Sequence, residues 1–152
     1  MAESNGNVNE ELFVRLKRRS NKPGNMTRDM GLTVTDVRPG IAEGDLFLAE
    51  NSVNPRGIVH GGTIFGVMDQ LGGLAACTTG YGTVTINGSI DFLRPVMPRT
   101  PLKAVAEVVK PGRRFTICEA KILSPEGKLL AKGSFTYCMM EPLEGTLKLT
   151  GD

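Results

Sequence analysis

The chain of 152 residues lacks the marks of several classes of protein. Its 18 Lys and Arg nearly balance 16 Asp and Glu, so the net charge of +2 gives no global field that would recruit nucleic acid or a membrane. The short basic run from Arg15 to Arg19 has few aromatic residues with it and is interpreted as a solvated helix face. No apolar run approaches the roughly 18 residues of a membrane span, and MAESNGNVNE is no signal peptide. We expect a soluble cytoplasmic protein that binds neither nucleic acid nor membrane.

Cysteine and histidine are too sparse and too scattered to form the common metal or nucleophile sites. Cys77, Cys118 and Cys138 show no CxxC spacing and lie in apolar segments, where a buried thiol is ordinary in a reducing compartment. The single histidine, His60, is separated from Cys77 by most of a predicted helix about 25 Å long, which excludes a Cys–His pair within one chain. Neither a G-x-S-x-G motif nor a glycine-rich phosphate loop occurs. We expect no metal and no cofactor.

The predicted elements describe one α+β domain. Apolar periodicity and the Gly and Pro turn signals give, in chain order, a helix at 10–19, strands at 32–37 and 45–49, a long helix at 61–79, and strands at 83–92, 102–109, 115–123 and 129–137. Short turns join the last four strands, which indicates an antiparallel meander covered on one face by the long helix. We expect residues 1–152 to form a single domain, with an N-terminal helix and turn at 1–24 and a loose tail at 141–152.

The long helix combines a carboxylate with an unusual number of glycines. Gly62, Gly66 and Gly73 share the helix face of Asp69, and Gly72 follows it by three residues. Each interior glycine costs about 1 kcal/mol relative to alanine, so the missing side-chain volume must serve a purpose. The glycine face would admit another backbone or a ligand; the alternative is tight packing with an incidental carboxylate, although an unpaired buried acid is costly. The opposite face would pack on the sheet through Ile64, Val67, Met68, Leu71, Leu74 and Ala75.

The start of the same helix offers a second chemical feature. Gly61 and Gly62 place backbone N–H groups, unhindered by side chains, at the positive end of the helix dipole. Such groups can stabilise a developing oxyanion. His60 and Asn54 precede them and could orient a carbonyl group or a water molecule. A lone histidine is more often a structural residue, but these neighbours favour a catalytic one.

These residues together resemble a known family. Asn54, the run His60-Gly61-Gly62, and Asp69 nine residues after His60 are similar to the motif of the hotdog-fold acyl-CoA thioesterases, in the phenylacetyl-CoA thioesterase (PaaI-like) branch of the 4-hydroxybenzoyl-CoA thioesterase superfamily. The segment TINGSIDFLRP, residues 85–95, is similar to the strand that follows the helix in that family. The likeness runs from about residue 30 to about residue 140. It implies a hotdog fold, an antiparallel sheet wrapped around one long central helix.

The resemblance also implies a role for each motif residue. The active site would lie between two subunits, with Asp69 of one acting as nucleophile or as general base on water, and the Gly61 N–H of the other polarising the thioester carbonyl. Asn54 would position the carbonyl or the water, and His60 would shape the loop and contact the carbonyl. Thr85 stands where relatives carry a hydroxyl near the attacking water. Because the coenzyme A thiolate is a good leaving group, one carboxylate and an oxyanion hole can suffice.

Coenzyme A, here part of the substrate, also carries phosphates. Lys110, Arg113 and Arg114 surround the Pro111-Gly112 turn and Arg94 ends a strand, so these cations are candidates for its nucleotide end. Gly62 is a further candidate for binding the substrate. Ordinary solvated charges at turns are an equal alternative for each cation. The resemblance implies at least a homodimer, and we expect a homotetramer formed from two dimers.

Two rival functions share the fold, so the fold cannot separate them from a thioesterase. One is a protein that binds acyl-CoA without hydrolysing it, as a sensor. A transcriptional sensor would need a DNA-binding module, and the residues before the first strand are too few for a helix-turn-helix. The other is a hotdog hydratase or dehydratase, which the position of Asp69 disfavours. We expect hydrolysis of an aryl- or short- to medium-chain acyl-CoA to the free acid and CoA. The sequence does not identify the acyl group. It also does not decide whether Asp69 acts as a nucleophile or as a general base.

Overall fold

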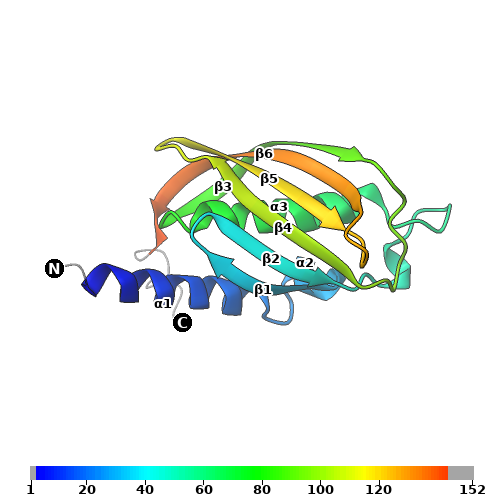
Figure 1. The fold of residues 1–152 in the computed structure, drawn as a ribbon, viewed down its shortest axis with the longest axis horizontal. Coiled ribbons are helices and arrows are strands. Elements are labelled where there is room, and N and C mark those ends of the chain that lie inside the picture. Colours follow the sequence, from blue (N-terminus) through cyan, green and yellow to red (C-terminus); the bar gives the residue numbers. More distant parts are fainter. Residues whose placement is uncertain (1–2, 144–152) are drawn as a thin grey trace.

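The computed structural model of the chain describes residues 3–143, with side chains from residue 10. The elements, in order, are helices α1 (Glu3–Ser20) and α2 (Met26–Met30), strands β1 (Leu32–Arg38) and β2 (Ile41–Leu46), the short 3-10 helix η1 (Glu50–Ser52), helix α3 (Gly61–Cys77), and strands β3 (Tyr81–Phe92), β4 (Leu102–Lys110), β5 (Phe115–Leu123) and β6 (Leu129–Pro142). The six strands form one antiparallel sheet in the order β1-β2-β4-β5-β6-β3. This sheet curls around α3 (Figure 1), which confirms the α+β class and the hotdog fold.

The apolar face of α3 is the centre of the core. Ile64, Val67, Met68, Leu71 and Ala75 each expose at most 1% of their surface, as the helical spacing predicts. The sheet supplies the other half of this core from the inward-facing residues of its strands, including Leu32, Ala106, Ile122 and Phe135. Burial of these side chains on both sides of the contact is the main source of stability for the fold.

The meander prediction is right for β4, β5 and β6 and wrong for β3. The edge of β4 that β3 would have used is already occupied by β2, with Ala42 opposite Ala106. Strand β3 therefore pairs with β6 at the far edge of the sheet, with Ser89 opposite Ser134. The turn residues, on which the prediction was based, indicate where strands end but not which distant strands pair.

Two predicted strand boundaries also differ from the structure. Strand β2 begins directly after Gly40, whose φ of +74° makes the tight turn, and it ends at Leu46 because the Phe47 N–H donates to the carbonyl of Gly31. Strand β6 continues through Pro142, since it pairs with the whole of β3, and Leu143 is buried. The loose-tail prediction is therefore wrong for 141–143. Residues 144–152 of that tail lie outside the described residues.

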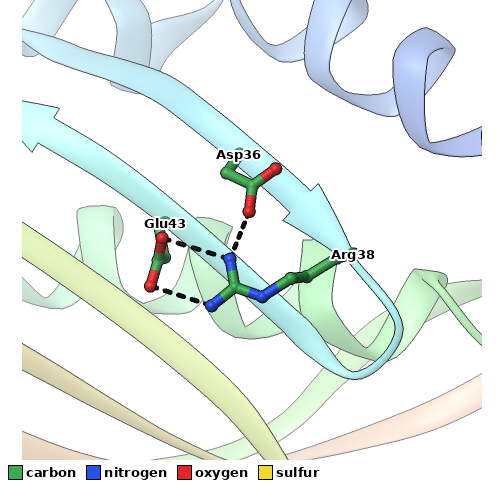
Figure 2. Close-up of polar contacts among 3 residues, drawn as sticks. All are labelled: Asp36, Arg38 and Glu43. Atoms are coloured by element: carbon green, nitrogen blue, oxygen red, sulfur yellow. Dashed lines mark hydrogen bonds and ion pairs between the residues drawn. The ribbon is translucent and has the colours of Figure 1, made fainter.

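The turn between β1 and β2 carries a small ion cluster (Figure 2). Asp36 and Glu43 face each other across the two strands, and the guanidinium group of Arg38 contacts both carboxylates. Hydrogen bonds to these carboxylates raise the pKa of Arg38, and the bond to Glu43 has the larger effect. All three side chains are 40–48% exposed, so these ion pairs add little net stability. Their main effect is that the positive charge of Arg38 offsets the repulsion between the two opposed carboxylates.

The side chain of Asn21 joins the end of α1 to the outer edge of the sheet. Its amide nitrogen donates to the carbonyl of Val34 and its oxygen accepts from the Val34 N–H, both at 2.8 Å. The amide thus pairs with β1 as a neighbouring strand would, at the edge where residues 3–143 supply no further strand. Together with buried Leu12 and Leu16 it holds α1 against β1.

Replacing this amide should weaken the fold measurably. We expect Asn21→Ala to lower the free energy of unfolding in urea by about 1–2 kcal/mol, because two hydrogen bonds to one backbone position are lost together. The matched control is Asn51→Ala, since Asn51 is exposed and its amide makes no hydrogen bond with the described residues. Equal stability of the two variants would contradict a structural role for Asn21.

Candidate active site

Asp69 lies in the middle of α3 and is held from two strands. The Thr85 hydroxyl of β3 donates to Asp69 Oδ1 at 2.8 Å. The Tyr137 hydroxyl of β6 donates to the backbone carbonyl of Asp69 at 2.8 Å and also approaches Oδ1 at 3.2 Å. None of the described residues donates a hydrogen bond to the second carboxylate oxygen, Oδ2. Asp69 is half-buried at the surface of the chain. The structure therefore brings together the predicted pair of Asp69 and Thr85 and adds Tyr137.

Sequence reasoning missed Tyr137 because it did not foresee the pairing of β3 with β6. In that register Thr85 and Tyr137 are direct partners, so both hydroxyls arrive over the same turn of α3. Tyr137 exposes only 1% of its surface. Burial, and next the negative charge of Asp69, raise the pKa of Tyr137, so the phenol stays protonated and serves as a donor.

The glycines near Asp69 serve two different purposes. A Cβ atom on Gly72 would lie 2.3 Å from the Tyr137 hydroxyl, so only glycine leaves room for that hydroxyl. Cβ atoms on Gly66 and Gly73 would meet nothing closer than 3.6 Å. Both of these are half-buried, and Gly62 is exposed. The predicted open glycine face therefore consists of Gly62, Gly66 and Gly73, whereas Gly72 accommodates the chain's own sheet.

His60 caps the N-terminus of α3. Its Nδ1 accepts a hydrogen bond from the Gly62 N–H at 2.9 Å, so Nε2 carries the proton of the neutral ring. The Gly62 N–H is thereby occupied. The N–H of Gly61, at the first helical position, meets no acceptor in the described part of the chain, and it remains the one donor of the Gly-Gly pair open to an oxyanion.

A cavity of about 400 Å³ lies beside this helix terminus. Gly61 and Asn54 line it together with Phe92 and Arg94. Asn54 Oδ1 accepts from the N–H groups of Arg56 and Ile58, so it shapes the loop, while its amide N–H groups bond none of the described residues. Arg94 donates to the carbonyl of Leu129 at 2.7 Å. The structure therefore groups Asn54, Gly61 and Arg94, three predicted site residues, around one opening.

These two groups of residues are separate within one chain. Gly61 and Asp69 are eight residues apart on α3, or about 12 Å along the helix axis, too far to act on the same carbonyl.

The remaining predicted cations, Lys110, Arg113 and Arg114, are exposed at the β4–β5 turn. This turn lies toward the C-terminal end of α3, opposite the end where Gly61 lies (Figure 1). The guanidinium of Arg114 stacks over the Phe115 ring at 5.2 Å from its centre. Within one chain these three cations therefore do not join Arg94.

The described residues include no membrane span and no metal cluster. None of their helices has both the length and the apolar character that crossing a membrane requires. No three side chains of the His, Cys, Asp and Glu types lie close enough together to hold a metal ion.

Comparisons with known proteins agree with this geometry. The model of the thioesterase superfamily matches residues 56–131, which include Gly61, Asp69 and Thr85. Acyl-coenzyme A thioesterase PaaI of Escherichia coli is 26% identical over 67% of this chain and 73% of its own length. The solved structure of the E. coli PaaI protein, at 20% identity, covers 84% of this chain and 93% of its own with a TM-score of 0.78, and so supports the fold.

A second solved structure resembles the chain as closely in sequence. A hypothetical thioesterase protein of Streptococcus pneumoniae, solved with coenzyme A, is 27% identical and covers 74% of this chain and 90% of its own, with a TM-score of 0.71. Alanine variants of that protein, at an aspartate and at a threonine sixteen positions apart, are also similar, with TM-scores of 0.70 and 0.69. The chain therefore belongs to the thioesterase superfamily, as a hotdog-fold thioesterase of the PaaI-like kind.

Proposed function

We propose that this thioesterase hydrolyses acyl-CoA at a site shared by two subunits, with Asp69 from one and Gly61, His60 and Asn54 from the other. The observation that carries this proposal is the division of unused groups along α3. Gly61 offers an N–H without an acceptor, and Asp69 offers Oδ2 without a donor, yet about 12 Å of helix separates them. A second copy of α3, running alongside in the opposite direction, would bring each group to its counterpart.

The relatives support the same assignment. The E. coli relative is named as an acyl-coenzyme A thioesterase, and the S. pneumoniae protein was solved with coenzyme A. The aspartate and threonine replaced in the latter are sixteen positions apart, which is also the separation of Asp69 and Thr85. These two residues, hydrogen-bonded to each other here, therefore stand as the proposed catalytic pair.

The chemistry follows from these groups. The Gly61 N–H, at the positive end of the α3 dipole, would stabilise the negative charge that develops on the thioester oxygen. Asp69 Oδ2 would either attack the carbonyl carbon or take a proton from the attacking water. Collapse of the tetrahedral intermediate would break the C–S bond and release the CoA thiolate. The net reaction consumes one water and yields the free acid and CoA, and the proposal needs neither metal nor cofactor.

Arg94 is the cation best placed for substrate, since it lines the same cavity as Gly61. Lys110, Arg113 and Arg114 would serve the CoA phosphates across the subunit boundary, because their turn lies at the other end of α3. The Phe92 ring, against Gly61, and the neighbouring apolar lining suit an aryl or a short to medium aliphatic acyl group. A homodimer is the smallest assembly that completes such a site, and a tetramer of two dimers remains our prediction.

Loss of the carboxylate should abolish turnover without unfolding the protein. Asp69→Asn keeps an oxygen acceptor for Thr85 and Tyr137 and removes the charge, so we expect kcat to fall by about 10³-fold. The value of kcat is measured as thiol release from a panel of acyl-CoA substrates that includes phenylacetyl-CoA and hexanoyl-CoA. Asp45→Asn, an exposed carboxylate on β2, is the control. Wild-type rates in Asp69→Asn would contradict the assignment, and tight binding without hydrolysis by the wild type would favour the acyl-CoA-binding alternative.

The oxyanion role of Gly61 can be tested with the helix intact. Gly61 is the first helical residue, where proline is well tolerated, and the extended backbone of His60 suits a following proline. Gly61→Pro removes the N–H and adds ring carbons, and we expect kcat to fall by about 10²-fold through loss of the donor. Gly61→Ala is the control, because its Cβ meets the same Phe92 ring at 3.1 Å but the N–H remains. Equal rates in the two variants would show that this N–H is not used.

A shared site also predicts recovery of activity on mixing. A heterodimer of Asp69→Asn and Gly61→Pro has one doubly defective site and one intact site. Random pairing of equal amounts should therefore restore about a quarter of wild-type activity. Thiol release after co-expression of the two variants measures it. No recovery, with heterodimers confirmed by a tag on one variant, would mean that each chain carries a complete site.

A further inference from the structure

We propose that Tyr137 is a positioning residue, which fixes the Asp69 carboxylate so that Oδ2 alone faces the substrate. This inference rests on the proposed function and adds a residue outside the motif. Its basis is geometric: the Tyr137 hydroxyl contacts both the backbone carbonyl and the carboxylate of the same residue, at 2.8 and 3.2 Å. A single rigid side chain thus fixes the position of Asp69 and the rotation of its carboxylate.

The two hydroxyls act on the same oxygen. Thr85 and Tyr137 both approach Oδ1, and a carboxylate oxygen has two lone pairs. Oδ1 is therefore filled, and Oδ2 is left for the reaction. Rotation about the last bond of an aspartate side chain is otherwise broad. Donors from two neighbouring strands would restrict it, and small errors in the placement of a reacting group reduce rate strongly.

The phenol is itself held firmly. Its ring stacks on Phe135, with ring centres 6.4 Å apart and an interplanar angle of 18°, and Phe135 in turn packs edge-on against Phe65 of α3. Gly72 provides the space for the hydroxyl, because a Cβ there would lie 2.3 Å from it. An interior glycine destabilises a helix relative to alanine, and the access of the phenol to Asp69 accounts for the glycine at this position. Because the pKa of Tyr137 is raised, its hydroxyl stays protonated and can donate a hydrogen bond.

Kinetics of Tyr137→Phe test the inference. The variant keeps the ring and removes only the hydroxyl. We expect kcat for phenylacetyl-CoA and hexanoyl-CoA to fall about 10-fold while KM stays within about 2-fold, because a bond that orients a charged group is lost and no substrate contact changes. Ser20→Ala is the matched control, since it removes another buried hydroxyl that donates to a helix carbonyl, that of Leu16 at 2.9 Å, and should leave kcat unchanged.

A second variant reaches the same contact from the helix. Gly72→Ala should displace the hydroxyl and lower kcat by a similar factor. Because both changes break one contact, the double variant should lose about 10-fold rather than about 100-fold. Lower thermal stability with unchanged kcat in both variants would reduce Tyr137 to a structural role and overturn the proposal, as would a raised KM alone. Full activity in Asp69→Asn would instead refute the proposed function.

Discussion

The structure depends on burying one helix whose middle carries a carboxylate. The apolar face of α3 must be buried against another element, and the curled sheet packs against it. The sheet then lies within hydrogen-bonding distance of the boundary between the buried and open faces of α3, where Asp69 lies. Because an unpaired carboxylate there would be costly, the strands that cover this turn of the helix supply donors, Thr85 from β3 and Tyr137 from β6.

This requirement explains features that would otherwise be unrelated. Hydroxyls from adjacent strands can meet at one oxygen only if the register of β3 against β6 places Thr85 opposite Tyr137. The phenol fits only if the helix lacks a side chain at Gly72. The pairing of β3 with β6 is in turn possible because β2 occupies the other edge of β4. Strand order, register and a helix glycine are thus consequences of the same contact.

Features that depend on neighbours in the chain were predictable from the sequence. The helical face of Ile64, Val67 and Leu71 and the start of α3 at Gly61 follow from periodicity and local sequence. The motif residues His60, Gly61 and Asp69 also indicate the family from the sequence alone. Tyr137 was not predictable in this way, because its role depends on a pairing between strands that lie about fifty residues apart in sequence. The division of the candidate site along α3, by contrast, follows from the sequence, since eight residues of predicted helix separate Gly61 from Asp69.

That division has a physical rationale. An oxyanion donor benefits from the helix dipole and belongs at a helix terminus, where backbone N–H groups are free. A carboxylate that acts as base or nucleophile gains nothing from that position, since the positive end of the dipole would lower its basicity. It is better placed in mid-helix, where a rigid sheet can orient it. One helix cannot satisfy both requirements for a single substrate, whereas two antiparallel copies can. The separation of Gly61 from Asp69 therefore favours a paired active site on grounds independent of any relative.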